Sequence, residues 1–152
     1  MIEYLILRRL SMWFNPIMIW LIRSPFHKLV SNDMLVVTYT GHWSGKRFVV
    51  PVNYSSQDNV LFTISLRHRK WWRNLRGGAY VLLRLQGKDI QASATVNADG
   101  QSVADLLMDL VRRNPAYARF LQIGYDTDGK PVLSDALRAA GTRVVIRFDL
   151  KR

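Results

Sequence analysis

The chain contains no cysteine and only three histidines, His27, His42 and His68, which lie far apart in the sequence. Without thiols there is no disulfide framework, no thiolate metal site and no cysteine nucleophile. Scattered histidines also fail to form the ligand spacing of a zinc site or the base of a catalytic triad, so no metal is expected. The acidic residues are few and single, and a pair of catalytic carboxylates does not stand out.

The scarcity of acids leaves the chain strongly basic. Lys and Arg number 22 against 11 Asp and Glu, a formal net charge of +11. A surface of this kind attracts anions: nucleic acid, an anionic membrane, or a phosphorylated or carboxylated ligand. A recognised nucleic-acid motif is missing and the cations do not follow one helix, so nucleic acid is not the expected partner.

The length of 152 residues is that of one domain, and we predict a single domain over 1–152. Residues 1–30 form an apolar and basic segment, predicted as an N-terminal amphipathic helical segment. Its longest uncharged run, 10–22, is shorter than the roughly 20 residues that a membrane-spanning helix needs. Trp13, Phe14 and Trp20 beside arginines suit a membrane interface, whereas the simpler alternative is a helix packed on the domain. The predicted location is the cytoplasm, with peripheral contact at the inner face of the membrane as a further hypothesis.

The rest of the chain is rich in strands. β-branched and aromatic runs with turn residues between them predict strands over 34–40, 47–54, 60–65, 80–85, 88–96 and 142–150. Residues 55–59 are predicted as a hairpin loop, and Pro51 marks an edge strand or a bulge because proline cannot donate to the ladder. Short helices are predicted over 67–76, 116–122 and 133–140, with a longer one starting in a capping box at Ser102. About six strands with few helices indicate a small antiparallel barrel.

Two segments have unusual compositions. The first is the run 40–47, whose glycine-flanked backbone N–H groups, with Ser44, Lys46 and Arg47, could hold an anion, although an ordinary hairpin turn is the simpler alternative. The second is the run 67–76, in which five cations and two tryptophans could stack on a planar ring while holding phosphate or carboxylate. The alternatives there are a tryptophan in the core with solvated cations, or binding of single-stranded nucleic acid.

In order along the chain, the motifs TYTG-x-x-SG-x-R at 38–47, VPVNY at 50–54, W-x-x-NL at 71–75 and NPAYARF at 114–120 resemble the deazaflavin-dependent nitroreductase family. The resemblance covers roughly residues 15 to 150. It implies a β-rich α+β fold, a split β-barrel of about six mainly antiparallel strands with an N-terminal helix and C-terminal helices packed on it. It also implies the deazaflavin coenzyme F-420 and hydride transfer from the reduced ring to a quinone, nitroaromatic or similar conjugated acceptor.

The resemblance further implies roles for individual residues. The cofactor's phosphate and oligoglutamate tail would meet Thr40, Gly41, His42, Trp43, Ser44, Gly45 and Lys46, with Arg47 beside them. Pro51 would abut the deazaflavin, and its ring and side chain would be lined by Ser65, Trp71, Trp72, Asn74 and Leu75. Tyr117 and Phe120 would cover the substrate side, with Tyr117 orienting or protonating the acceptor.

The chain departs from the family pattern at two places. His42-Trp43 stands where relatives usually carry a basic pair, so the tail could instead be held by Lys46, Arg47 and the cluster from Arg67 to Lys70, or the cofactor could differ. Asn114 stands where some members have a substrate-facing tyrosine. The alternatives are a split barrel that binds FMN or another lipophilic ligand, and a non-catalytic basic module on membranes or nucleic acid. The chain is expected to act as a monomer or a homodimer.

Overall fold

The computed structural model describes residues 16–21, 23 and 34–151. Seven strands pair over these residues: β1 Met34–Thr40, β2 Arg47–Asn53, β3 Ser55–Gln57, β4 Val60–Leu66, β5 Ala79–Leu85, β6 Lys88–Asn97 and β7 Arg143–Leu150. The helices after β1 are the 3₁₀ helix η2 Trp71–Leu75 and the α-helices α2 Gly100–Arg113, α3 Ala116–Leu121 and α4 Leu133–Gly141. Upstream of β1, residues 16–21 are helical, with Met18 buried and Trp20 exposed. Trp13 and Phe14, predicted to suit a membrane interface, lie outside the described residues.

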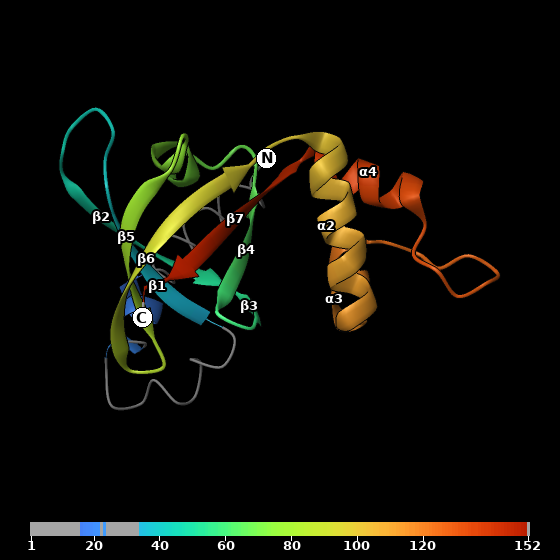
Figure 1. Cartoon of the computed structure of the whole chain (residues 1–152), viewed down its shortest axis with the longest axis horizontal. Helices are drawn as coiled ribbons and strands as arrows, with labels where there is room; N and C mark the ends of the chain where they lie inside the picture. The colour runs from blue at the N-terminus through green and yellow to red at the C-terminus, as the bar shows by residue number, and fades with distance from the viewer. Residues whose placement is uncertain (1–15, 22, 24–33, 152) are drawn as a thin grey trace, which may run out of the picture.

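All neighbouring strands are antiparallel, in the order β2-β1-β5-β6-β7-β4-β3. The sheet curls until the edge strand β2 lies against β4, which makes a split barrel. Figure 1 shows the C-terminal helices α2, α3 and α4 gathered on one side of this sheet and the turn between β1 and β2 on the other side. The predicted fold class is therefore confirmed, and Pro51 lies in an edge strand as expected.

Three parts of the chain differ from the predicted elements. The helix expected over 67–76 is the shorter 3₁₀ helix η2, Trp71–Leu75. The loop expected over 55–59 contains a short strand, β3, which pairs with β4 and leaves only Asp58 and Asn59 to make the turn, with Asp58 at a φ of 56°. The helix α2 begins at Gly100 rather than in a capping box at Ser102. Its N-cap is Asp99, whose carboxylate accepts a hydrogen bond of 2.9 Å from the backbone N–H of Ser102. An aspartate before the first turn satisfies an N–H group that the helix leaves unpaired, so it caps better than a serine inside the helix.

Two hydrophobic cores share the sheet. The barrel core contains Val144, Ile146 and Phe148 of β7 together with Trp72 and Leu75 of η2, which close one end of the barrel. The second core lies on the outer face, where α2, α3 and α4 pack around Val145 of β7 and against the partly buried Phe62 and Ile64 of β4. The alternation of side chains along a strand sends neighbouring residues to opposite faces. One strand therefore supplies side chains to both cores.

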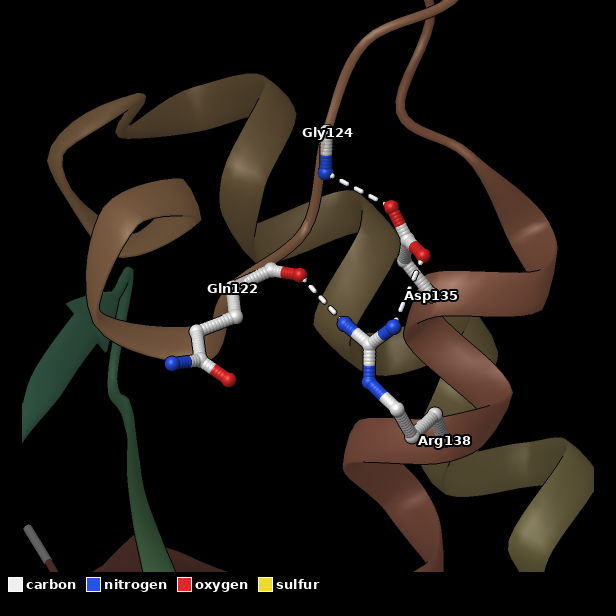
Figure 2. Close-up of polar contacts among 4 residues, drawn as sticks. All are labelled: Gln122, Gly124, Asp135 and Arg138. Carbon is white, nitrogen blue, oxygen red and sulfur yellow. Dashed lines mark hydrogen bonds and ion pairs between the residues drawn. The ribbon is translucent and has the colours of Figure 1, made fainter.

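The connection from α3 to α4 is held by a polar cluster (Figure 2). The Asp135 carboxylate accepts a hydrogen bond of 2.9 Å from the Gly124 backbone N–H and forms an ion pair of 3.0 Å with Arg138. Arg138 also donates to the backbone carbonyl of Gln122, a residue with a left-handed φ of 56° that ends α3. The cluster ties the end of α3 to the first turn of α4, where a carboxylate is also favoured by the helix dipole.

Replacing Asp135 with alanine should lower the free energy of unfolding by about 1–3 kcal/mol, because the Gly124 N–H loses its acceptor and Arg138 loses its partner. The matched control is Asp109→Ala, which removes an exposed ion pair with Arg113 within α2 and should change stability by about 0.5 kcal/mol or less. Urea denaturation of both variants measures the difference. Equal losses in the two variants would contradict a special role for Asp135.

Candidate functional site

The turn between β1 and β2, residues 40–47, is held by its own hydrogen bonds. The backbone N–H of Gly41 donates to the Lys46 carbonyl at 2.7 Å, and that of Gly45 donates to the Gly41 carbonyl at 3.0 Å. The Lys46 N–H donates to Ser44 Oγ at 3.2 Å, and Gly45 has the positive φ of 67° that glycine tolerates. These N–H groups are already paired, so an anion at this turn would be held mainly by the exposed side chains of Lys46 and Arg47.

The turn is also tied to η2, which lies about thirty residues away in sequence. The His42 backbone N–H donates to Asn74 Oδ1 at 2.9 Å, and the Asn74 amide nitrogen donates to the Trp71 carbonyl at 3.1 Å. The two segments that the sequence singled out separately are therefore neighbours in the fold. The Asn74 side chain accepts from one backbone group with its oxygen and donates to another with its nitrogen, so it positions the turn on η2.

Aromatic side chains pack directly beneath this turn. Tyr39 stacks on Phe48 with ring centroids 5.7 Å apart, and its ring lies 6.2 Å from that of Trp71. A Cβ at Gly41 would lie 2.7 Å from the Phe48 ring, so the close approach of backbone and ring requires glycine there. Burial raises the pKa of Tyr39 above its ordinary value, against the attraction of Arg69, and keeps the phenol protonated at neutral pH.

Four of the residues expected to line a cofactor ring are packed inside the barrel. Trp71, Trp72, Ser65 and Leu75 are all buried. The Trp71 indole N–H donates to Ser65 Oγ at 3.0 Å, and the Trp72 indole N–H donates to the Arg67 carbonyl at 3.3 Å. Their indole donors are thus satisfied by the protein, and the side chains form the floor below the turn. Pro51, also expected beside the ring, is buried in β2, and Asn74, the remaining expected neighbour, is half-buried.

Arg67 is occupied by the protein itself. One nitrogen of its guanidinium lies 2.9 Å from the Ala98 carbonyl, 3.3 Å from that of Arg143 and 3.5 Å from that of Ala140. These carbonyls belong to the segment before α2, to the start of β7 and to the end of α4. The cation therefore joins the barrel to the helices, and the tail-binding role considered for the cluster from Arg67 to Lys70 falls to its other members.

The surface formed by the turn and η2 is cationic and free of acids. Exposed cations line it at Lys46, Arg47, Lys70, Arg73 and Arg76. The sequence contains neither Asp nor Glu in 34–57 or in 59–88. Arg73 and Arg76 also lie over the Trp72 ring, at 5.7 and 4.8 Å from its centroid, which holds them beside the turn. We call this surface, residues 40–48 together with η2 and its flanking cations, the basic face.

A cavity of about 420 Å³ lies between the sheet and the helices, lined from β3, β4, α2 and α3. Phe62, Ile64 and Leu110 form apolar wall, and Arg113 and Tyr117 are among its polar residues. A second cavity of about 310 Å³ adjoins it, shares Tyr117 and includes the exposed Phe120. Both residues expected on the substrate side thus lie at these cavities. Neither cavity is lined by residues 40–47 or by η2, so the predicted site is divided between two regions.

The apolar wall of this cavity, formed by Phe62 and Ile64, is not among the site residues predicted from the sequence. Phe62 and Ile64 alternate with the buried Leu61, Thr63 and Ser65 along β4. That alternation shows that they lie on the opposite face from the barrel interior. It does not show that α2 and α3, from later in the chain, would cover that face incompletely and leave a cavity there.

No family model and no curated protein matches the chain. Several solved structures are similar to it. One described as an F420 reductase is 14% identical over 85% of this chain and 95% of its own, with a TM-score of 0.46. The FAD and heme binding protein from Mycobacterium smegmatis is 14% identical over 85% and 67%, with a TM-score of 0.48. A FAD-binding protein from Mesorhizobium loti is 16% identical over 82% and 85%, with a TM-score of 0.44. The fold assignment rests on the strand pairing of this chain.

The bond between His42 and Asn74 leads to a first prediction for this region. Asn74→Ala should leave the barrel folded but speed hydrogen exchange at the His42 amide about fivefold, since a net hydrogen bond contributes roughly 1 kcal/mol. Asn74→Asp keeps an acceptor for His42 and should retain most of the protection. Exchange measured by NMR compares them; identical exchange in both variants and the parent would show that the bond does not hold the turn.

A second prediction concerns Arg67. Arg67→Met should lower the free energy of unfolding by roughly 2–3 kcal/mol, because the carbonyls of Ala98 and Arg143 lose a charged donor. Arg67→Lys should lower the free energy of unfolding by a smaller amount, since a cation remains. Lys70→Met should change it by about 0.5 kcal/mol or less. Urea denaturation ranks the three variants. If Arg67→Met matches Lys70→Met, the guanidinium does not join the barrel to the helices.

Proposed function

We propose that the chain is an oxidoreductase that binds the deazaflavin coenzyme F-420 and transfers a hydride from its reduced form to a conjugated acceptor such as a quinone or nitroaromatic. The observation that carries the proposal is the hydrogen bond between His42 and Asn74. It brings together the two motifs on which the resemblance depends, TG-x-x-SG and W-x-x-NL, although tens of residues separate them. An ordinary hairpin turn would not need this tie.

The polyanionic tail of the coenzyme fits the basic face. Lys46 and Arg47 are exposed beside a turn that carries no acid, and Lys70 of the neighbouring segment adds a third exposed cation. Phosphate and carboxylate groups form charge-assisted hydrogen bonds with such side chains. Because the turn is already held by backbone bonds, binding orders few additional residues.

The chain's own residues would position the coenzyme and exclude water. When bound, the deazaflavin supplies the hydride, which is why the protein needs neither a nucleophile nor a metal of its own for this chemistry. Trp71 and Tyr39 give the turn a firm aromatic floor, and the Trp71 N–H is satisfied by Ser65 within the barrel. Since Trp71 is buried, it would support the site from beneath.

The acceptor would occupy the cavity between sheet and helices. Its volume of about 420 Å³ is typical of pockets for small molecules, and Phe62 and Ile64 offer apolar contact to a flat ring. An acceptor that receives a hydride develops negative charge on an oxygen or nitrogen. Tyr117, which lines the cavity, would donate a hydrogen bond or a proton to that atom from its hydroxyl.

The proposal requires the coenzyme to bridge the basic face and this cavity, which share no lining residue. A barrel that holds FMN or another lipophilic ligand is the competing proposal, since it needs the cavity but not a long polyanionic tail. Titration of the purified chain with oxidised and reduced deazaflavin, FMN and a single-stranded oligonucleotide separates the two. Tight binding of FMN with no binding of deazaflavin would overturn the deazaflavin proposal.

Coenzyme affinity should fall as salt is added, because salt screens the attraction between exposed charges. It should also drop roughly tenfold in the double variant Lys46→Gln/Arg47→Gln, a modest loss because solvent already weakens exposed charge-assisted contacts. The matched control is Lys88→Gln/Lys130→Gln, which removes two exposed cations away from the basic face and should change affinity little. Isothermal titration gives both values. An affinity indifferent to salt and to both double variants would move the tail site away from this turn.

A further inference from the structure

The most exposed of the large hydrophobic side chains in the described part of the molecule lies at the tip of the turn between β1 and β2. Trp43 is 94% exposed, and the ring contact found for it is an edge contact with His42 at 5.2 Å between centroids. Phe48, at the turn-proximal end of β2, is 43% exposed. Isolated hydrophobic residues on a surface are common. An indole as exposed as Trp43, at the end of a turn, is a candidate for burial against a partner surface.

The turn that carries Trp43 is held in place. Its backbone bonds at Gly41 and Gly45, and the tie from His42 to Asn74, fix the residues on both sides of the indole. A side chain on a fixed turn loses little conformational freedom when its surroundings change. Trp43 is thus presented outward by the fold itself, and this arrangement does not depend on the proposed enzymatic activity.

The turn that carries the indole is rich in cations, and residues 34–57 contain neither Asp nor Glu. Lys46 and Arg47 follow Trp43 on the same turn, and the flanking cations of η2 lie beside it through the contact of Asn74 with His42. In proteins, tryptophan is enriched at the level of lipid headgroups, and basic clusters next to it are attracted to anionic lipid. A single protruding indole on a convex turn offers no groove along which a nucleic-acid strand would run.

We propose that the basic face docks on an anionic lipid bilayer, with Trp43 inserted at the level of the headgroups and the cations in contact with lipid phosphates. This inference concerns residues different from the amphipathic segment 1–30. Among the helices that the structure describes, none combines the length and apolarity needed to cross a bilayer. The contact is therefore a surface contact whose strength depends on both the indole and the charge.

Co-sedimentation of the full chain with vesicles tests the proposal. The chain should partition onto vesicles of phosphatidylcholine mixed with phosphatidylglycerol and much less onto pure phosphatidylcholine. Trp43→Ala should lower the partition coefficient about tenfold, through loss of the buried apolar area, and Trp43→Phe should lower it less. Lys46→Gln/Arg47→Gln should lower it roughly 30-fold, at about 1 kcal/mol for each cation near the surface.

Trp20→Ala is the matched control, because Trp20 is also a largely exposed tryptophan, 62% exposed, but lies in the helical segment 16–21. It should leave the partition coefficient unchanged. Quenching of tryptophan fluorescence by lipids with brominated acyl chains should be present in the parent and reduced in Trp43→Phe. Thermal midpoints of all variants verify that they are folded.

Four outcomes would overturn the proposal. The chain could stay in the supernatant with anionic vesicles. Trp20→Ala could release it while Trp43→Ala does not, which would assign the contact to the amino-terminal segment. Brominated lipids could quench the parent and Trp43→Phe equally. A single-stranded oligonucleotide could bind the basic face with the same dependence on Trp43 while vesicles do not, which would make nucleic acid the partner.

Discussion

Strand β7 is the constraint on which the rest of the structure depends. It pairs with β4 on one side and with β6 on the other, so it joins the early and late hairpins into one curled sheet. Ile146 and Phe148 face the barrel core, whereas Val145 packs against the helices. Because strand side chains alternate between faces, the same eight residues hold both cores. A shift of one residue in register would exchange the two sets and expose both cores.

Polar contacts then join parts of the fold that the cores leave separate. Arg67 binds carbonyls at the ends of three segments, and Asp135 ties α3 to α4. Asn74 does the same for the turn at residues 40–47. In each case one side chain pairs with backbone groups at or near the end of an element. Such groups are costly to leave unpaired when buried, so these side chains determine how loops and helices sit on the barrel.

This arrangement explains why the molecule has two candidate functional regions. Around the turn, interior packing of Trp71 and Trp72 leaves the exposed surface to cations and to Trp43. On the far side, helices that cover β4 only partly leave a cavity at Tyr117 with both polar and apolar lining. The proposed hydride transfer would use both regions, with the coenzyme tail on the basic face and the acceptor in the cavity, whereas the proposed lipid contact would use the basic face alone. A protein held at a bilayer by the basic face would lie close to any hydride acceptor that is dissolved in the lipid.

Local pattern in the sequence was sufficient for six of the seven strands, while β3 was expected as part of a loop. Alternation along β4, the glycines around the first turn and Pro51 at an edge are properties of neighbouring residues, and these parts of the fold were predicted because short-range geometry determines them. The sequence also determined the excess of cations and their separation from acids.

The tertiary structure alone decided which of these residues face solvent. Trp71, Trp72 and Arg67 read as ligand-binding residues in sequence, yet packing against distant strands and carbonyls occupies them, while Trp43 is left outside. Periodicity states which face a side chain lies on, but the partner that covers that face comes from another part of the chain. The cavity at Tyr117 and the contact between His42 and Asn74 therefore exist only once the chain has folded.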